Sequence, residues 1–409
     1  MLRITKVTVL LLSAAWIADY VDRVVVTFAL PAIGRDLHLS HTQQGAIVSV
    51  FFLAYAATQI PAGLLADRFG ALTMAAIGML AWSVFTGLTA LAWSFSALLV
   101  LRFLFGLVQG VYPSAAMKAL AERSLPEQRT TATGWTNTSN AVGTLLAAVI
   151  AAVVQPLWGW RVMFALISLL GLAALVAWRV WMPQPLPQDR IELVADRGVP
   201  WPVLRAPALL GFAVLFFGYD TVVWGLGSWV PTYLHDVHGV STSRAALLAM
   251  PATILAAAGI VLGARLSDRL DGRPRLIVVP AMAVTVVLLV ALPHIGSIAL
   301  FAAVAALLAG VASLAYMPAF AVPLRALPPV VLGAATAVII FGGQLAGVVT
   351  PLLFGAVTDR FSYAAAFAAL AAGPLLAAAV AWFVPQSADA FRARLSGRFA
   401  APDPKESLA

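Results

Sequence analysis

Residues 63–70, Gly-Leu-Leu-Ala-Asp-Arg-Phe-Gly, form a short polar break in an apolar part of the chain, and a related break follows at residues 263–269. The two breaks belong to a wider set of matches at an offset of 200 or 201 residues. The matching positions are Pro31 with Pro231, Asp36 with Asp236, His38 with His238, Gly63 with Gly263, and Asp67-Arg68 with Asp268-Arg269. Chance gives one or two such matches, so this set indicates an internal duplication.

The composition excludes a soluble globular protein. Of the 409 residues, 62% are hydrophobic and 10% are charged, whereas soluble domains average about 45–50% apolar and about 25% charged residues. A water-soluble fold of this length has too little interior for so much apolar surface, so the expected solvent is a lipid bilayer. The chain has no cysteine, which excludes disulfides, thiolate metal sites and cysteine nucleophiles.

The apolar runs predict an all-α membrane protein of twelve transmembrane helices, because a backbone in lipid must satisfy its own hydrogen bonds. The basic residues 1–6 resemble a signal peptide, but Asp19 and Asp22 interrupt the apolar run that follows, so we expect a retained first helix. The predicted spans are about 7–33, 44–67, 72–92, 96–120, 131–154, 160–183, 206–234, 244–267, 276–293, 298–322, 331–356 and 363–384.

Lys and Arg are distributed unevenly over the predicted loops. The side that holds both termini receives 19 of the 25 basic residues, the other side four, and two lie within helices. Cytoplasmic loops are the basic ones, so both termini are expected in the cytoplasm. The net charge of +8 is therefore interpreted as a topology signal, and no nucleic-acid partner is expected.

A polar stretch divides the spans six and six. The expected organisation is a bundle at 1–183, a cytoplasmic linker at 184–204, a second bundle at 205–385 and a cytoplasmic tail at 386–409. Because the halves share one topology, the repeat axis lies along the membrane normal. In such architectures the substrate binds between the halves near the midplane, and the halves rock around it. We expect a monomer.

The first predicted helix carries Asp19-Tyr20-Val21-Asp22-Arg23. Charged groups within an apolar helix are unfavourable, so they are candidate functional residues. Residues 19, 22 and 23 are expected on one helical face, where they could line one wall of a cavity. The alternative is a self-neutralising cluster that only fixes helix packing.

Arg102 is the second basic residue expected within the membrane. Arg23 and Arg102 are permanently cationic and can each form paired hydrogen bonds with a carboxylate, which predicts an anionic substrate. An alternative for Arg102 is capping of backbone carbonyls. Further polar residues in apolar helices could bind substrate hydroxyls or link helices: Tyr55, Gln59, Asn140, Tyr219 and Gln344.

The Gly63 to Gly70 loop, its copy at Gly263 to Arg269, and the arginine in the fourth helix resemble the signatures of the major facilitator superfamily. This resemblance implies two pseudo-symmetric six-helix bundles. It also implies that the loop residues act at a gate, where glycines let helices approach and charges pair. The implied gating residues are Gly63, Asp67, Arg68, Asp268 and Arg269. The family pattern usually continues with basic residues, whereas Ala71 and Leu72 follow here.

Several segments narrow the resemblance to the anion:cation symporter family. They are the Tyr-Val-Asp-Arg run at 20–23, the stretches at 51–63 and 229–234, and the glycines at 343–355. The resemblance implies import of a sugar acid or another organic anion with protons, in a bacterial inner membrane. Alternatives are a drug–proton antiporter or a uniporter of the same fold, or a membrane-embedded enzyme or sensor. The fifth helix lacks the proline motif of drug antiporters.

Proton coupling requires a carboxylate that changes its charge during transport. Asp22 matches the family's helix-1 Asp-Arg pair, and Asp220 in the seventh span and Asp19 are the further candidates. The family's second acid, in the fourth helix, is replaced by Gln109, so the proton stoichiometry stays open.

Four histidines, His38, His41, His235 and His238, lie in equivalent loops, and we expect them to be solvated rather than metal-bound. No hydrolase, nucleotide-binding or metalloprotease motif is present in the sequence. No cofactor, metal or catalytic residue is therefore expected.

Overall fold

The structure is a computed structural model that describes residues 1–186 and 201–395, apart from a few side chains within those ranges. The described residues form α-helices and one short 3-10 helix. The first half contains α1 (Arg3–Asp36), α2 (His41–Phe69), α3 (Ala71–Thr89), α4 (Phe95–Gln109), α5 (Tyr112–Ala121) and α6 (Pro126–Trp181). The second half contains α7 (Trp201–Leu204), α8 (Pro207–His238), α9 (Thr242–Arg269), α10 (Pro274–Ala291), η2 (Leu292–His294), α11 (Ile298–Ser313), α12 (Pro318–Ala326), α13 (Pro329–Arg360), α14 (Tyr363–Leu370), α15 (Ala372–Phe383) and α16 (Ala388–Leu395).

These helices account for all twelve predicted spans. Three spans are broken into the pairs α4–α5, α11–α12 and α14–α15, and α6 contains two spans that meet at Gly159, whose φ is 76°. Within the described residues, nine helical stretches are long and apolar enough to cross a membrane. One of these nine is the double-length α6, and α1 and α2 have 34 and 29 residues. At 1.5 Å per residue, both exceed the roughly 30 Å of hydrocarbon.

The duplication is visible in local structure. Ser40 caps α2 and Ser241 caps α9, each through its hydroxyl to the backbone N–H three residues later. The fourth helix of each half is broken near its middle, and a proline stands in the first turn of the piece that follows, Pro113 in α5 and Pro318 in α12. Proline is tolerated there because the first turn has no intrahelical partner for its missing N–H.

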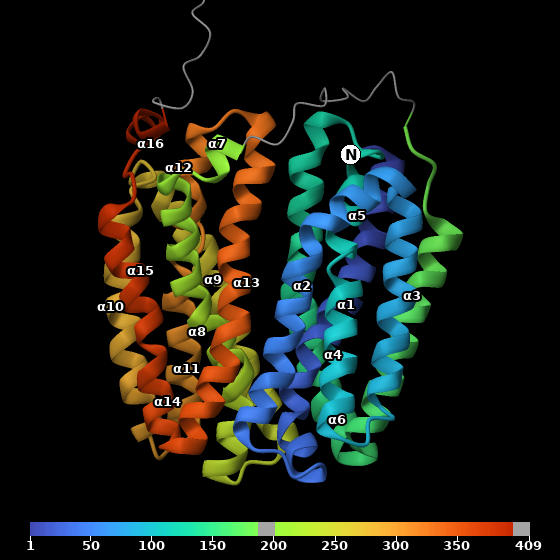
Figure 1. Ribbon diagram of the computed structural model, residues 1–409, viewed down its shortest axis with the longest axis vertical. Helices are drawn as coiled ribbons and strands as arrows, with labels where there is room; N and C mark the ends of the chain where they lie inside the picture. Colours follow the sequence, from blue (N-terminus) through green and yellow to red (C-terminus); the bar gives the residue numbers. More distant parts are fainter. Residues whose placement is uncertain (187–200, 396–409) are drawn as a thin grey trace, which may run out of the picture.

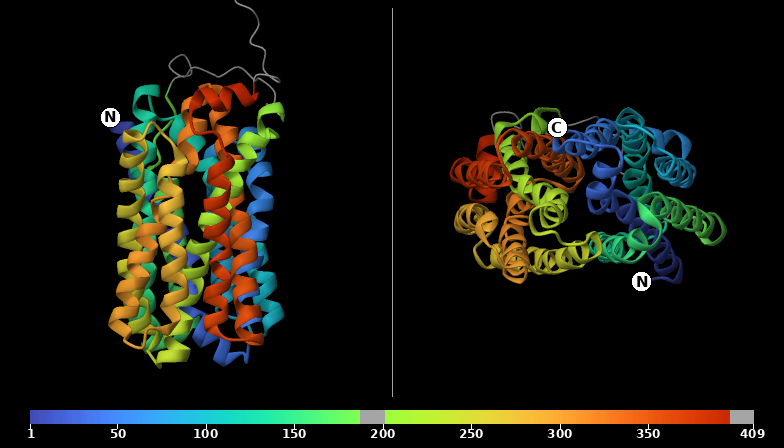
Figure 2. Two further views of the ribbon diagram at one scale, coloured as in Figure 1. Left: turned by 90° about the vertical axis from the view of Figure 1, so that its left-hand side faces the viewer. Right: turned by 90° about the horizontal axis from the view of Figure 1, so that it is seen from below.

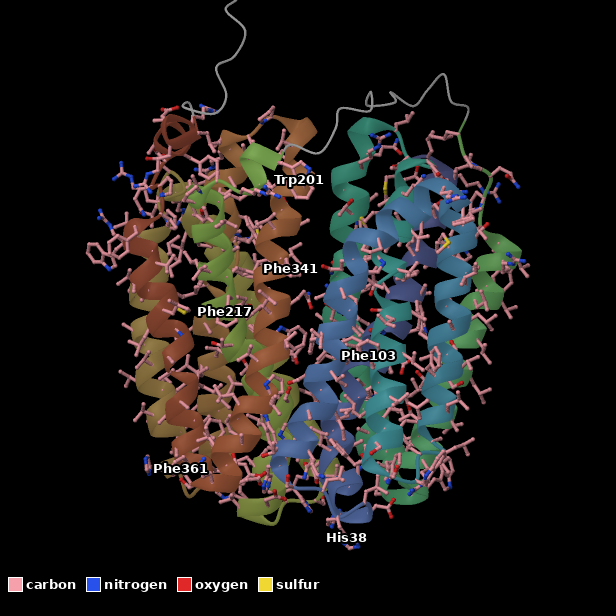
Figure 3. The ribbon with its side chains drawn as sticks, in the orientation of Figure 1. His38, Phe103, Trp201, Phe217, Phe341 and Phe361 are labelled. Atoms are coloured by element: carbon pink, nitrogen blue, oxygen red, sulfur yellow. The ribbon has the colours of Figure 1, made fainter. Side chains whose placement is uncertain are left out.

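The helices form two bundles that lie side by side, α1–α6 and α8–α15 (Figures 1 and 2). Each bundle has its own apolar core, one within residues 9–182 and the other within 203–395, with Ala246 of α9 joining the first. The N-terminus and α16 lie at one end of the molecule (Figure 1). His38 and Phe361 lie at the opposite end (Figure 3), which we call the distal end.

Small residues allow close helix crossings inside each bundle. A methyl group on Gly106 of α4 would overlap the carbonyl oxygen of Phe51 on α2. Gly259 of α9 approaches the carbonyl oxygen of Gly310 on α11 in the same way. Without a hydrophobic driving force between helices in lipid, such close packing supplies much of the association energy.

The two bundles are joined at the distal end. Gly45 of α2 lies against the carbonyl of Pro351 on α13, and Ser49 Oγ accepts from Leu352 N at 3.1 Å. The rings of Phe52 and Trp224 lie 4.3 Å apart. Among the described residues, every hydrogen bond between the bundles involves this end, through α2, α8 and α13. The conformation is therefore closed at the distal end.

Candidate functional site

Arg23 occupies a buried position in the middle of α1, where it is 7% exposed. Its guanidinium lies over two tyrosine rings, 4.5 Å from the centroid of Tyr55 and 4.9 Å from that of Tyr20, and 5.6 Å from Phe51. Aromatic faces stabilise a cation that has lost its water. The aromatic residues of α1 and α2 thus hold a permanent positive charge at this depth.

Two polar groups hold Arg23 in place. Its Nη2 lies 3.1 Å from Asp19 Oδ2, one turn earlier on α1, and its Nε donates to Gln109 Oε1 at 3.3 Å. The Gln109 amide in turn donates to the carbonyl of Asp19 at 3.1 Å. The other carboxylate oxygen, Asp19 Oδ1, is buried with no hydrogen-bond partner among the described residues. Guanidinium has five N–H donors, and Asp19, Gln109 and the Tyr55 hydroxyl engage only some of them, so others can reach a ligand.

Asp22 does not share this network. Both of its carboxylate oxygens lie within hydrogen-bond distance of the Thr86 hydroxyl on α3, at 2.7 and 2.6 Å. Asp19 and Arg23 thus contact each other as their shared helical face predicts, whereas Asp22 contacts α3 instead. Adjacent residues lie about 100° apart around a helix of 3.6 residues per turn, which turns Asp22 toward α3.

Arg102 lies inside the N-terminal bundle and is 2% exposed. Its guanidinium lies 5.1 Å from the ring centroids of Phe105 and Phe164, and it interacts electrostatically with Asp22. Its Nε and Nη2 have no hydrogen-bond partner among the described residues. In this conformation Arg102 is placed to balance Asp22 rather than to meet a solute.

A second polar cluster lies in the C-terminal bundle around Asp220 of α8. The Asp220 residue is 9% exposed, and no hydrogen bond or ion pair of its carboxylate is found within the described residues. A methyl group on Gly343 of α13 would overlap Asp220 Oδ2. The adjacent Tyr219 hydroxyl lies 3.5 Å from Ser313 Oγ, and its ring lies 5.9 Å from that of Tyr316.

The two clusters face each other across the bundle interface. Tyr20 of α1 lies near Tyr316, which in turn lies near Asp220. A fixed cation on one bundle and an unpaired carboxylate on the other are thus separated by aromatic and hydroxyl groups. Such a site can bind an anion at Arg23 and exchange a proton at a carboxylate.

Comparison with known proteins identifies the family. The sequence profile of the Major Facilitator Superfamily matches residues 12–349. The chain belongs to the Major Facilitator Superfamily. It is accordingly a multi-pass membrane protein, and the relatives that it matches are transporters rather than enzymes.

Two superfamily relatives and one solved structure are informative. The hexuronate transporter of Bacillus subtilis (strain 168) is 32% identical over 269 residues, which cover 64% of each chain. The hexuronate transporter of Escherichia coli (strain K12) is 27% identical over 405 residues, covering 92% of this chain and 93% of the relative. A bacterial homologue of the human lysosomal transporter Spinster, in an inward-facing and unoccupied conformation, superposes with a TM-score of 0.78 at 20% identity, covering 98% of this chain and all of the other. That last similarity supports the superfamily fold alone.

The remaining predicted binding residues occupy several helices of the superfamily fold. Tyr55 is buried beneath Arg23 on α2, and Gln59 lies half-buried one turn further along. Asn140 of α6 and Gln344 of α13 are half-buried, and their side-chain oxygens have no hydrogen-bond partner among the described residues. These two amide oxygens are therefore available as hydrogen-bond acceptors in this conformation.

The predicted gating residues of the superfamily loops are only partly described. Gly63 and Asp67 lie in α2, but the surroundings of Gly63 and the side chain of Asp67 fall outside the described set. Arg68 is exposed, with its guanidinium 5.3 Å from the Phe69 ring. In the second half Asp268 Oδ1 accepts from Arg325 Nη2 at 2.8 Å, and Arg269 is exposed. The Asp268–Arg325 pair joins α9 to α12 within one bundle.

His41 is 28% exposed, and it also makes contacts that its expected role as a solvated loop histidine does not include. Its ring lies between two aspartates of the other bundle, with Nδ1 2.8 Å from Asp359 Oδ1 and Nε2 3.1 Å from Asp236 Oδ2. His235 Nδ1 contacts the carbonyl of Val240 at 2.9 Å, and His38 is exposed. Within the described residues no group of three or more His, Cys, Asp or Glu side chains could hold a metal ion.

No feature of the sequence singled out Thr86 and Tyr316 as site residues. Thr86 is one of several hydroxyl residues in apolar helices, and only the packing of α3 on α1 brings it to Asp22. Tyr316 stands at the break between α11 and α12. Pro113 and Pro318 stand at the same point of the fourth helix in the two halves. These prolines could have indicated a helix break there. Irregular backbone is tolerated in membranes only where it is buried or solvated, so such a break is expected to face a cavity.

Proposed function

We propose that this chain is a secondary transporter that imports a small organic anion, such as a sugar acid, together with protons by alternating access. The observation that carries this proposal is Arg23, a buried cation near the bundle interface with unused donors. The two hexuronate transporters among the relatives support a substrate with both a carboxylate and hydroxyls.

Arg23 would bind the substrate carboxylate through paired N–H donors, because a guanidinium fork matches the planar carboxylate. Tyr55 and Tyr20 hold the fork in one orientation. Asp19 competes for the same donors, so substrate binding would weaken the Asp19–Arg23 pair. The amides of Asn140 and Gln344 would then bind substrate hydroxyls.

The proton sites in this proposal are Asp22 and Asp220, with Asp19 as the further candidate. Asp22 is balanced by Arg102 and Thr86, so a movement of α3 or α4 against α1 changes its electrostatic surroundings. Asp220 has no cation beside it among the described residues, so entry of water or of a cation into the site would change its electrostatic surroundings. Because Gln109 cannot titrate, these carboxylates would supply the coupling.

The proposed topology places both termini in the cytoplasm of a bacterium, with the distal end facing outward across the inner membrane, and the transporter acting as a monomer. The 19-to-four distribution of basic residues supports this orientation. The N-terminus and α16 lie at the same end of the molecule, as this topology requires (Figure 1). In that orientation the structure is closed toward the outside.

Uptake into proteoliposomes tests the proposal. Labelled glucuronate and galacturonate should accumulate when the outside is acidic relative to the lumen, and a proton ionophore should remove the accumulation. Asp220→Asn should lower the number of protons moved per substrate and leave some exchange. Equal uptake with and without the pH gradient would favour a uniporter, and no uptake of any organic anion would refute the proposal.

A further inference from the structure

His41 stands at the first residue of α2 and bridges two acids that belong to the other bundle. The two acids come from different helices, Asp236 from the end of α8 and Asp359 from the end of α13. One ring nitrogen lies 2.8 Å from Asp359 and the other 3.1 Å from Asp236. Both imidazole nitrogens are therefore within hydrogen-bond distance of a carboxylate oxygen.

The donors and acceptors around His41 are matched only if its ring is protonated. A neutral imidazole has one N–H donor and one acceptor nitrogen, whereas an ionised carboxylate only accepts. With two carboxylates in contact, a neutral ring leaves one nitrogen lone pair facing an oxygen. Only the imidazolium donates to both, and charge-assisted bonds of this kind are stronger than neutral ones.

The remaining donors around the acids keep both of them ionised. Asp359 also accepts from the backbone N–H of His41 at 3.0 Å, and from the backbone N–H and hydroxyl of Thr42 at 2.7 and 2.6 Å. Asp236 Oδ2 accepts from the Tyr363 hydroxyl at 2.7 Å. A carboxylate that accepts several hydrogen bonds is stabilised in its charged form.

The titratable groups that face the ring come from three further helices. They are Asp236 and Tyr233 of α8, Asp359 of α13, and Tyr363 of α14, whose ring lies 5.4 Å from the imidazole. His235 also interacts with Asp236, but its own ring is engaged with Val240. His41 lines an open surface pocket of about 430 Å³, so water reaches it.

The geometry points to a second kind of proton site: we propose that His41, Asp236 and Asp359, which we call the distal clasp, bind a proton more tightly when the bundles are closed at the distal end than when they are open. Opening that end would separate the ring on α2 from the acids on α8 and α13. A proton on His41 therefore favours the closed conformation, because its partners exist only there.

The direction of the pH effect follows from linkage. The hydrogen bond to Asp236, followed by that to Asp359, raises the pKa of His41 above its usual value, against the opposing effect of burial. The stabilisation of the closed state is then complete below about pH 6.5, the ordinary histidine value. It is lost as the pH rises through the raised value. Acid at the distal face should close this end, and alkali should release it.

This inference rests on the alternating-access part of the proposed function and not on the identity of the solute. A conformational measurement without substrate tests it separately from uptake. If spin-label distances never change under any condition, alternating access fails. If they change with substrate but not with protonation of His41, only the distal clasp fails.

Double electron–electron resonance on protein in lipid nanodiscs provides the test, since the chain has no native cysteine. Labels at Trp93→Cys and Leu300→Cys, 78% and 54% exposed and on opposite bundles near the distal end, report closure. Between pH 5.5 and 8.5 the closed-to-open ratio should fall by about tenfold for each unit by which the pKa of His41 is raised. His41→Gln should reduce that change to less than about twofold.

Two further variants keep the test decisive. His38→Asn alters an exposed histidine of the same loop, whose φ of 53° asparagine tolerates, and should behave like wild type. In Asp236→Asn the new amide N–H can donate to the free nitrogen of a neutral His41 ring. The contact then needs no proton on His41, so the distal end of this variant should stay closed at alkaline pH. The proposal is overturned if His41→Gln keeps the wild-type pH response, or if Asp236→Asn opens with pH as wild type does.

Discussion

Arg23 pairs with Asp19, one turn earlier on α1, and not with its sequence neighbour Asp22, which accepts instead from Thr86. The two acids of the first helix therefore have different partners. Asp19 neutralises the cation that we assign to substrate binding, and Asp22 faces Arg102 inside the bundle. Because their partners differ, substitutions at Arg23 and at Asp22 are expected to have different effects.

Arg23→Ala should abolish detectable binding, with affinity for a hexuronate at least about 100-fold weaker, because charge-assisted hydrogen bonds contribute about 1.5–3 kcal/mol each. Arg23→Lys should restore binding poorly, since an ammonium cannot reproduce the planar fork. Calorimetric titration of the detergent-solubilised protein measures both. Arg102→Lys is the control and should be milder. Unchanged affinity of Arg23→Ala would show that the anion binds elsewhere.

Asp22→Asn should abolish pH-driven accumulation, because the amide cannot change its charge during the cycle. Thr86→Val is the matched control, since it removes the hydroxyl that donates to Asp22 and leaves a group that titrates. It should shift the pH dependence of uptake and keep accumulation. Proton flux per substrate in liposomes distinguishes the two variants. Normal accumulation by Asp22→Asn would exclude this residue as a proton site.

Gly343→Ala should disturb the Asp220 pocket. The added methyl overlaps Asp220 Oδ2 and lies 2.7 Å from Phe216 Cε1, and overpacking of this kind destabilises by about 1–3 kcal/mol. We expect a lower thermal midpoint and slower uptake. Gly333→Ala, on the same helix with no atom within 4 Å of the added carbon, should resemble wild type. Equal melting curves for the two variants would contradict the packing described at Asp220.

Gly355→Ala should shift the distal end toward the open state at every pH. Its methyl would overlap the carbonyl oxygen of His41 and lie 3.0 Å from Thr42 N, so closure of α13 on α2 becomes strained. Overpacking of this kind destabilises the closed state by about 1–3 kcal/mol, which raises the open-to-closed ratio about fivefold or more. The same spin-label pair measures it, again with Gly333→Ala as the control. A closed distribution equal to that of wild type would contradict the contact.

Reporter fusions test the topology. Alkaline phosphatase and green fluorescent protein, fused after about residue 195 and at the C-terminus, should both report the cytoplasm, because the basic residues are concentrated on that side. A fusion in the loop after α1 should report the periplasm and serves as the opposite control. A periplasmic signal at residue 195 or at the C-terminus would exclude the proposed orientation.

The sequence determined the architecture because lipid leaves few choices. Each apolar run of sufficient length must be a helix, and the matches near 200 residues, such as Pro31 with Pro231, revealed the duplication before any coordinates. Charged residues inside such helices marked Arg23, Asp22 and Asp220 as candidates for the same reason: they are unfavourable in hydrocarbon unless they serve a function.

Only the tertiary structure decided which groups meet. Asp22 hydrogen-bonds with Thr86 on α3, and Arg23 with Gln109 on α4. His41 contacts Asp236 and Asp359, which lie 195 and 318 residues further along the chain. Hydropathy and helical periodicity describe neighbours along one helix, whereas these partners depend on how helices rotate and pack against each other. The distal clasp also depends on the conformation, because its two sides belong to different bundles that are in contact only while that end is closed.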